Sequence, residues 1–333
     1  MIEYKGIKRE KTNMPATKFS ISEHYIITLF PVGSSFGFKG KRYTVDKSGK
    51  PTCSKGEPKT DIYIRAYNEN GEKAEFKITY KQENADFLEN KTNAERAEQI
   101  FGENWSDIIS NATKEIEDSF YHRPTIYKKA SGRTEEGCIT LGWKYELLNK
   151  KSGDLSAEVL LTDEQTIDVY AGTHLDTEKR HSKIGNEVIY DSGVANYLLF
   201  KNPEELKSAQ DVIDNIISIE EYVKKEQPKI YFACKALNYR TKRVDENGNL
   251  DPKYDGNRPL SVYIEWSKKD DVLHADFVFD RPLENGGDYA FDQLWKALYE
   301  MGITTTDDID EDNVDESVNI YDWCWLNLRV NLK

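Results

Sequence analysis

Residues 61 to 81 carry a pattern that fits a β-hairpin with one buried face. The stretches "DIYIRAY" and "KAEFKITYK" are rich in β-forming residues and flank "NENG", a turn that ends in glycine. Successive strand residues point to opposite sides, so Phe76, Ile78 and Tyr80 share one face. The apolar face is expected to pack on a core. The opposite, polar face holds Glu75, Lys77, Thr79 and Lys81.

Helical and β-rich stretches alternate irregularly along the rest of the chain. A capping-box spacing between Ser20 and Glu23 predicts a short helix before the hairpin. A second hairpin is expected within 137–161. Further helices are expected at 93–101, 104–120, 203–225 and 288–302, and further strands at 229–239, 259–267 and 272–280. This order predicts a mixed α+β (α/β) fold, with a central mixed sheet flanked by helices and an additional β-rich part.

The length of 333 residues suits one large domain or two that share an interface. We expect residues 1–125 to form a core around the hairpin. Residues 126–333 are expected to form a β-rich and helical portion that completes the fold. One continuous domain is the alternative.

The charge is strongly acidic but unevenly distributed. A formal net charge of -13 argues against general adhesion to nucleic acid, because phosphate binding normally uses clustered Lys and Arg. Much of the acid lies in "TTDDIDEDNVDE" at 305–316, whereas 5–18 and 239–243 are locally basic. A single DNA-binding face therefore remains compatible with the sequence.

Several classes of protein are disfavoured by the sequence. No apolar run approaches 18 residues and no charged-then-apolar leader occurs, so we expect a soluble, cytoplasmic protein without a membrane partner. Neither GxxxxGK[ST] nor GxGxxG occurs, so no nucleotide cofactor is expected. The four cysteines lack the spacing of a zinc site, and we expect them to be inert packing residues. They are Cys53, Cys138, Cys234 and Cys324.

The hairpin also supplies candidate catalytic residues, namely Asp61, Glu75 and Lys77. Two neighbouring carboxylates repel each other unless a cation lies between them, and a hard oxygen-ligand site of this kind suits magnesium. A nearby lysine can orient or help to deprotonate a water that attacks a phosphodiester. If the register places Asp61 beside Glu75, the sequence predicts a Mg²⁺ site with Lys77 next to it.

This combination resembles the PD-(D/E)xK signature of type II restriction endonucleases. The resemblance rests on Asp61, on Glu75-Phe76-Lys77, and on the stretch "KITYKQENADF" followed by a helix; it covers about residues 55–102. Thr60 stands where the family usually has proline. The resemblance implies a restriction-endonuclease-like core within 1–125.

The same resemblance implies an activity and a set of roles. Asp61 and Glu75 would bind Mg²⁺ and Lys77 would assist the water, with Glu23 as a further acid from the preceding helix and Gln82 near the site. The implied reaction is hydrolysis of phosphodiester bonds in double-stranded DNA at a short specific site. A palindromic site calls for two-fold symmetry, so a homodimer is expected.

A long segment after residue 237 offers donors that could read base edges. Arginine and asparagine pair bidentately with guanine and adenine. The predicted DNA-binding residues are Asn238, Arg240, Lys242, Arg243, Asn257 and Arg258. An ordinary solvated insertion is the alternative for this segment.

Two broader alternatives stay open at the level of sequence. Glu75 and Lys77 could be solvated residues on the exposed face of an ordinary hairpin. The whole chain could also be a non-enzymatic DNA mimic or anti-defence protein, whose acidic surface competes with DNA for a basic partner. The net charge of -13 favours the second alternative, and the hairpin acids with their lysine favour the nuclease.

Overall fold

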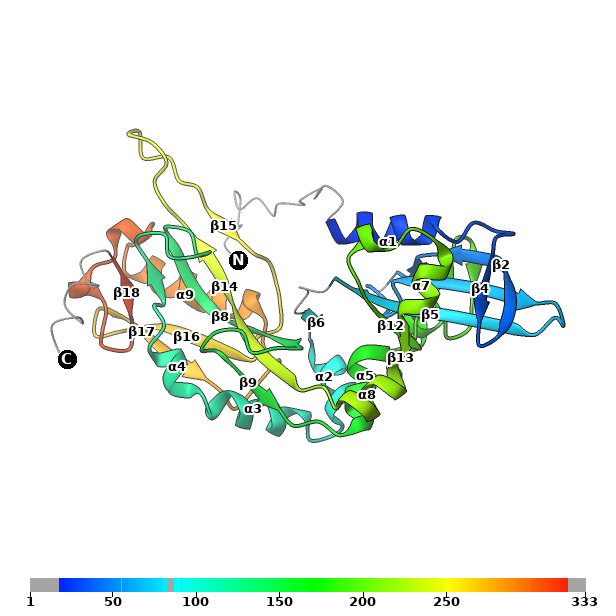
Figure 1. Ribbon diagram of the computed structural model, residues 1–333. Helices are drawn as coiled ribbons and strands as arrows, with labels where there is room; N and C mark the ends of the chain where they lie inside the picture. Colours follow the sequence, from blue (N-terminus) through cyan, green and yellow to red (C-terminus); the bar gives the residue numbers. More distant parts are fainter. Residues whose placement is uncertain (1–17, 55, 83–86, 91, 323–333) are drawn as a thin grey trace. The chain divides into compact units, whose positions relative to one another are not determined.

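The computed structural model describes residues 18–54, 56–82, 87–90 and 92–322, which divide into two compact units (Figure 1). The large-sheet unit contains Glu89–Val159 and the described residues from Tyr231 onward. The hairpin unit contains the described residues up to Leu88 together with Leu160–Ile230. The basic segment at 5–18, apart from Lys18, and Cys324 lie outside the described residues.

This division differs from the expected boundary between 1–125 and 126–333. The chain passes between the units after residues 88, 159 and 230, so each unit is assembled from separate segments. The strand β6 (Phe87–Glu89) lies at the first of these passages. The mixed α+β character predicted from the sequence is confirmed, because helices and sheets occur in both units.

The large-sheet unit is built on long antiparallel strands. Five strands run in the order β15 (Lys253–Tyr254), β14 (Ile230–Arg240), β8 (Cys138–Leu148), β16 (Val262–Lys269) and β17 (Val272–Val278). Shorter strands pair at its margins: β7 (Ile126–Tyr127), β9 (Ser156–Val159) and β18 (Ile320–Tyr321). The helices are α2 (Ala94–Phe101), α3 (Trp105–Lys114), α4 (Glu117–Tyr121) and α9 (Gly287–Glu300), with the 3-10 turns η2 (Thr306–Asp308) and η3 (Glu311–Asn313).

One of the expected connections in this unit is wrong. Residues 137–161 supply β8 and β9, but β9 pairs with β14 rather than with β8. The strand β14 therefore lies beside both, and the predicted second hairpin does not form. Burial raises the pKa of the Cys138 thiol to about 11 and that of Cys234 to about 12, which makes both poor nucleophiles, as expected for packing residues.

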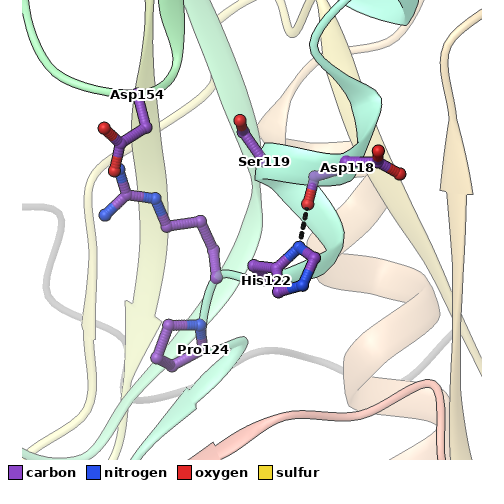
Figure 2. Close-up of a pocket in the computed structure, with 6 residues that line it drawn as sticks. Asp118, Ser119, His122, Pro124 and Asp154 are labelled. Carbon is purple, nitrogen blue, oxygen red and sulfur yellow. Dashed lines mark hydrogen bonds and ion pairs between the residues drawn. The ribbon is translucent and has the colours of Figure 1, made fainter. Parts of the chain in front are cut away.

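A shallow pocket of about 270 Å³ opens beside α4 in the same unit (Figure 2). Its lining is polar, and Arg123 pairs with Asp154 at 3.2 Å across it. The lining residues are Asp118, Ser119, His122, Arg123, Pro124 and Asp154. None of the residues predicted from the sequence to act in catalysis or in DNA binding belongs to this set.

The hairpin unit contains a six-stranded sheet. Its order is β1 (Ser35–Phe38), β2 (Lys41–Gly49), β4 (Ile62–Asn68), β5 (Lys73–Lys81), β12 (Tyr197–Phe200) and β13 (Ile216–Ser218). Only the β5–β12 pair is parallel among these neighbours, so the sheet is mixed. A small second sheet joins β11 (Glu187–Val188), β10 (Lys183–Ile184) and β3 (Pro51–Thr52).

Helices surround the six-stranded sheet. They are α1 (Lys18–Thr28), α5 (Asp163–Ala171), α6 (Thr177–Arg180), α7 (Ala209–Asn215) and α8 (Ile219–Glu226), with the 3-10 turn η1 (Pro203–Glu205). The single helix expected over 203–225 is therefore wrong. Ser208 starts α7 by accepting a hydrogen bond from the Asp211 N–H, and Ile216–Ser218 then joins the sheet beside β12.

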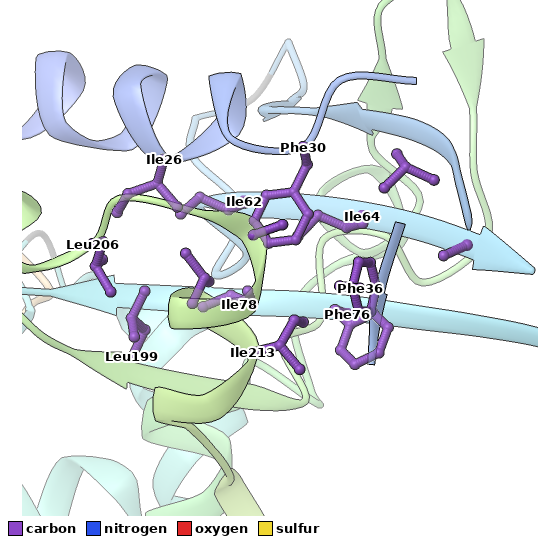
Figure 3. Packing of buried hydrophobic residues seen from close by; sticks show 14 of the residues in the cluster. Ile26, Phe30, Phe36, Ile62, Ile64, Phe76, Ile78, Leu199, Leu206 and Ile213 are labelled. Carbon is purple, nitrogen blue, oxygen red and sulfur yellow. The ribbon is translucent and has the colours of Figure 1, made fainter. Parts of the chain in front are cut away.

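The core of the hairpin unit lies between α1, α7 and one face of the sheet (Figure 3). Ile26 of α1 and Phe30, just after the end of that helix, point onto Ile62 and Ile64 of β4. All four side chains are fully buried. The hairpin supplies Phe76, Ile78 and Tyr80 to this cluster, as its alternation predicts. This packing fixes α1 across the sheet, with Ser22 and Glu23 facing inward as well.

Candidate active site

The register of the hairpin separates the residues that were expected to meet. Ile62 pairs with Ile78, and the Asp61 N–H donates to the Ile78 carbonyl at 2.9 Å, so Asp61 lies opposite Thr79. Glu75 instead pairs with Arg65. Four residues along β5 (79 − 75) correspond to roughly 13 Å. The prediction that Asp61 and Glu75 hold one Mg²⁺ is therefore wrong.

Glu75 and Lys77 each have a partner within the fold. Glu75 accepts a hydrogen bond from the buried Tyr63 hydroxyl and pairs with Lys73 at 3.1 Å. Burial acts to raise the pKa of Glu75, but these two partners outweigh it and lower that pKa. Lys77 donates to the Asp191 carbonyl at 3.0 Å, and burial lowers its pKa. The two side chains stabilise the sheet rather than facing Asp61.

Asp61 is held in place at the open end of the hairpin. Its Oδ2 accepts a hydrogen bond from the Tyr80 N–H at 2.8 Å and from the Thr79 hydroxyl at 3.4 Å. The Asp61 carboxylate is therefore bound to the end of β5, at the two residues before Lys81. Thr79 and Lys81 take the places, relative to Asp61, that Glu75 and Lys77 were expected to take.

A second carboxylate reaches this end from α1. Glu23 is 8% exposed and forms an ion pair with Lys50. Burial, followed by the charge of Asp61, raises the pKa of Glu23; the hydrogen bond from Lys50 and the charges of Lys50 and Lys81 offset this only in part. The charges of Asp61 and Lys81 therefore both act on Glu23.

Gln82 completes the group that meets at the open end. Its Nε2 donates to the Ser22 hydroxyl at 3.1 Å, which joins the end of β5 to the first half of α1. We call the five residues Glu23, Lys50, Asp61, Lys81 and Gln82 the acid–lysine cluster. Glu23, Asp61 and Gln82 were expected from the sequence, and their catalytic roles stay predictions.

Lys50, Thr79 and Lys81 were not among the site residues predicted from the sequence. The position of the turn, however, indicates that Thr79 lies opposite Asp61, with Lys81 two residues further on. Asn68 and Glu72 flank the turn, with the Asn68 N–H donating to the Glu72 carbonyl at 3.1 Å. Counting seven residues away from the turn along each strand pairs residue 61 (68 − 7) with residue 79 (72 + 7). Lys50 has no comparable signal, because it lies between two other strands and meets Glu23 only in the folded unit.

The oxygen chemistry of the acid–lysine cluster fits magnesium. Within the described ranges, no group of three or more His, Cys, Asp or Glu side chains could hold a metal. Magnesium, however, is usually bound by one or two carboxylates together with waters and substrate phosphates. Glu23 and Asp61 supply two carboxylates, and the neighbouring Thr60 hydroxyl is buried without a hydrogen-bond partner. Glu23 would thus supply the second carboxylate that was expected from Glu75.

The predicted DNA-binding residues are less available than the sequence indicates. Asn238 and Arg240 belong to β14, and the segment between β14 and β15 extends from the sheet as a narrow ribbon (Figure 1). The Arg240 guanidinium pairs with both Glu135 and Asp251, and its side chain is only 14% exposed. Reading a base would require Arg240 to leave these acids.

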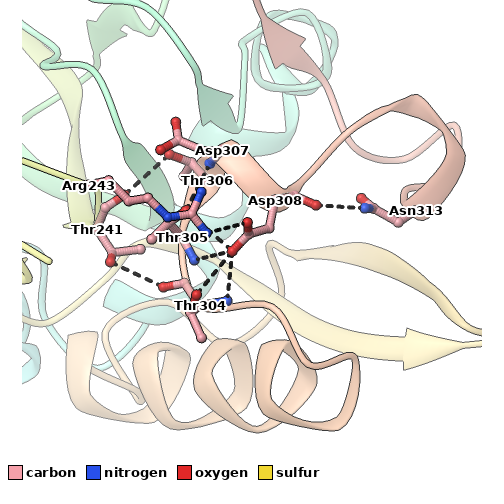
Figure 4. Close-up of polar contacts among 8 residues, drawn as sticks. All are labelled: Thr241, Arg243, Thr304, Thr305, Thr306, Asp307, Asp308 and Asn313. Atoms are coloured by element: carbon pink, nitrogen blue, oxygen red, sulfur yellow. Dashed lines mark hydrogen bonds and ion pairs between the residues drawn. The ribbon is translucent and has the colours of Figure 1, made fainter. Parts of the chain in front are cut away.

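Arg243 is bound to the acidic C-terminal segment (Figure 4). It donates to Asp308 at 2.8 Å, and Asp308 also accepts hydrogen bonds from Thr304 and Thr305. Burial opposes ionisation of Asp308, but these donors lower its pKa to about 2. Asn257 is exposed but accepts from the Asp288 N–H at 3.2 Å. Of the remaining predicted contacts, Arg258 is exposed and Lys242 half-buried.

No family model, curated protein or solved structure matches this chain. The assignment of a function therefore depends on the geometry of the acid–lysine cluster. Within the part of the chain that the structure describes, no helix is both long and apolar enough to cross a membrane.

Proposed function

We propose that the protein is a Mg²⁺-dependent endonuclease that hydrolyses phosphodiester bonds of double-stranded DNA at a short specific site. One observation carries the proposal: Gln82, next to Lys81, donates to Ser22 of α1 beside the buried Glu23, and Asp61 accepts from the Tyr80 N–H at the same end of β5. Two acids and a lysine from three elements reproduce the chemistry of the PD-(D/E)xK signature, with its last two positions moved to Thr79 and Lys81.

Four members of the cluster, all except Lys50, have roles that follow from their places. Asp61 and Glu23 would hold Mg²⁺, which when bound acts as a Lewis acid toward the phosphate and lowers the pKa of a water. The Tyr80 N–H orients the Asp61 carboxylate. Lys81 would orient the attacking water by donating a hydrogen bond to it. Gln82 would keep α1 attached to the end of β5 through Ser22.

The buried acid supports the nuclease over the acidic DNA mimic. The net charge of -13 favours a mimic that competes with DNA for a basic partner, but such a protein needs its acids on the surface. Glu23 is 8% exposed, and its ionised form is disfavoured there by burial and by Asp61. An acid kept at this cost in stability is typical of a functional site. A homodimer remains part of the proposal for a palindromic site.

A digest of unmethylated plasmid and genomic DNA in Mg²⁺ tests the proposal. We expect discrete fragments from the wild-type protein and none from Asp61→Asn or Lys81→Met. Glu75→Gln and Lys77→Met are matched controls from the same strand pair and should still cut. Absence of cleavage in any divalent metal, together with inhibition of another nuclease, would support the DNA mimic instead.

A further inference from the structure

Lys50 occupies a position that the proposed chemistry does not explain. It follows β2 and precedes β3, and its Nζ donates to Glu23 Oε2. The Lys50 side chain is 40% exposed, whereas that of Glu23 is 11% exposed. The lysine therefore reaches an inward-facing acid from the solvent side.

The Lys50 ammonium acts on both acids of the cluster. Burial works to lower the pKa of Lys50, but the hydrogen bond and charge of Glu23, followed by the charges of Asp61 and Glu57, raise it. A positive charge close to a carboxylate stabilises its ionised form. Lys50 supplies that charge from within the chain.

We propose that the Lys50 ammonium is a resident counter-cation of the Glu23 carboxylate, and that a divalent cation must displace it in order to bind. This inference rests on the proposed function, because it concerns the same acids. The Glu23 Oε2 atom that accepts from Lys50 is also an oxygen that a hard cation would use. Lys50 thus regulates the affinity of the site for metal.

The two partners differ in their freedom to separate. Glu23 is fixed by α1, whose neighbouring Ile26 is fully buried in the core. Lys50 has a flexible four-carbon stem and a partly solvated ammonium, so it can move into water. Displacement would therefore move the lysine and leave the acids in place.

The test compares Mn²⁺ binding by the wild-type protein and by Lys50→Met, without DNA, by calorimetry at pH 8. Mn²⁺ prefers the same oxygen ligands as Mg²⁺. Removing a charge-assisted hydrogen bond that competes with the metal should make binding about three- to tenfold tighter. Thermal unfolding of both proteins checks that the variant is folded.

Two further variants make the result specific. Lys41→Met removes the same charge from an ion pair with Glu72 (2.5 Å) that lies on the surface of the same sheet, so it should leave Mn²⁺ affinity unchanged. In a Glu23→Gln background, Lys50→Met should change affinity about twofold or less, because the shared oxygen ligand is gone.

Three outcomes overturn the inference: equal or weaker Mn²⁺ binding by Lys50→Met, the same gain from Lys41→Met, or no saturable Mn²⁺ binding by either protein. Failure of the proposed function is separate, since it would appear as saturable Mn²⁺ binding without DNA cleavage. DNA cleavage combined with unchanged affinity in Lys50→Met would reject the counter-cation and keep the nuclease.

Discussion

The middle and the open end of the β4–β5 hairpin carry similar residues in different surroundings. In the middle, Glu75 is bound by Tyr63 and Lys73, which lie on the hairpin itself. The main-chain groups there are also engaged, since Asn196 accepts from the Lys77 N–H at 2.8 Å and donates to the Glu75 carbonyl at 3.0 Å. Glu75 and Lys77 are therefore both satisfied by partners other than Asp61.

The open end differs because α1 adds a charge from outside the hairpin. Burial and the charge of Asp61 raise the pKa of Glu23 there, whereas the pKa of Glu75 is lowered by its partners despite burial. One acid stabilises the fold in its ionised form and the other destabilises it. The acid-x-Lys stretch Glu75-Phe76-Lys77 therefore does not mark the proposed site, whose second acid comes from α1.

The largest expected effect is on DNA cleavage. Asp61→Asn and Lys81→Met should each lower the single-turnover cleavage rate about 10²- to 10⁴-fold, because each removes a group placed at the reacting phosphate. Glu75→Gln and Lys77→Met should stay within about threefold of the wild-type rate. Loss of cutting in the second pair, with cutting intact in the first, would return the site to the middle of the hairpin.

A smaller effect is expected on stability in the middle of the hairpin. Tyr63→Phe removes the donor to Glu75 from a residue that is fully buried, and it should lower the free energy of unfolding by about 1 kcal/mol. Urea denaturation at pH 7 measures this, and the cleavage rate of the same variant serves as the control. A cleavage defect as large as that of Asp61→Asn would contradict the separation of the two regions.

The smallest effects are opposite in sign at neutral pH. Glu75, with its lowered pKa, stabilises the fold above the ordinary carboxylate pKa of about 4.3, and this contribution is lost as pH falls through the folded-state value. Glu23, with its raised pKa, costs stability above its folded-state value, and the cost disappears as pH falls. At pH 7, Glu23→Gln should raise stability and Glu75→Gln should lower it.

We expect each of these changes to be below about 1 kcal/mol, because Lys50 and Lys73 are partly exposed. Thermal unfolding of both variants between pH 4 and pH 8 measures them. A stability gain from Glu75→Gln, or a loss from Glu23→Gln, at pH 7 would contradict the assignment of the two acids.

The sequence predicts local structure better than it predicts contacts between residues that are far apart in the chain. Alternation at Phe76, Ile78 and Tyr80 was enough to place the hairpin and its buried face, because side-chain direction depends only on neighbouring residues. The predicted pairing of Asp61 with Glu75 is wrong because spacing along the chain does not by itself give proximity. The position of the turn, which sets the register of the two strands, was not used in that prediction. A shift of four residues moved the site from Glu75 to Thr79.

Other parts of the site depend on packing that no local pattern contains. Glu23 was proposed from the family resemblance, but its pairing with Lys50 requires α1 to cross the sheet. Arg240 illustrates the reverse case, since its residue type suits a base contact while Glu135 and Asp251 hold it. Propensity also failed at Ile216–Ser218, where joining the sheet beside β12 overrides a helical pattern.

The hairpin unit is formed from two separate segments of the chain, which has a consequence for its folding during synthesis on the ribosome. The strand β5 ends at Lys81, yet its parallel neighbour β12 begins at Tyr197, so 115 residues (197 − 81 − 1) separate them. At 5–20 residues per second, roughly 6 to 23 s pass between the synthesis of one strand and the other. Through that interval one edge of β5 lacks its native partner, which makes a nascent chain ending near residue 125 prone to aggregate, whatever the chemistry of the finished site.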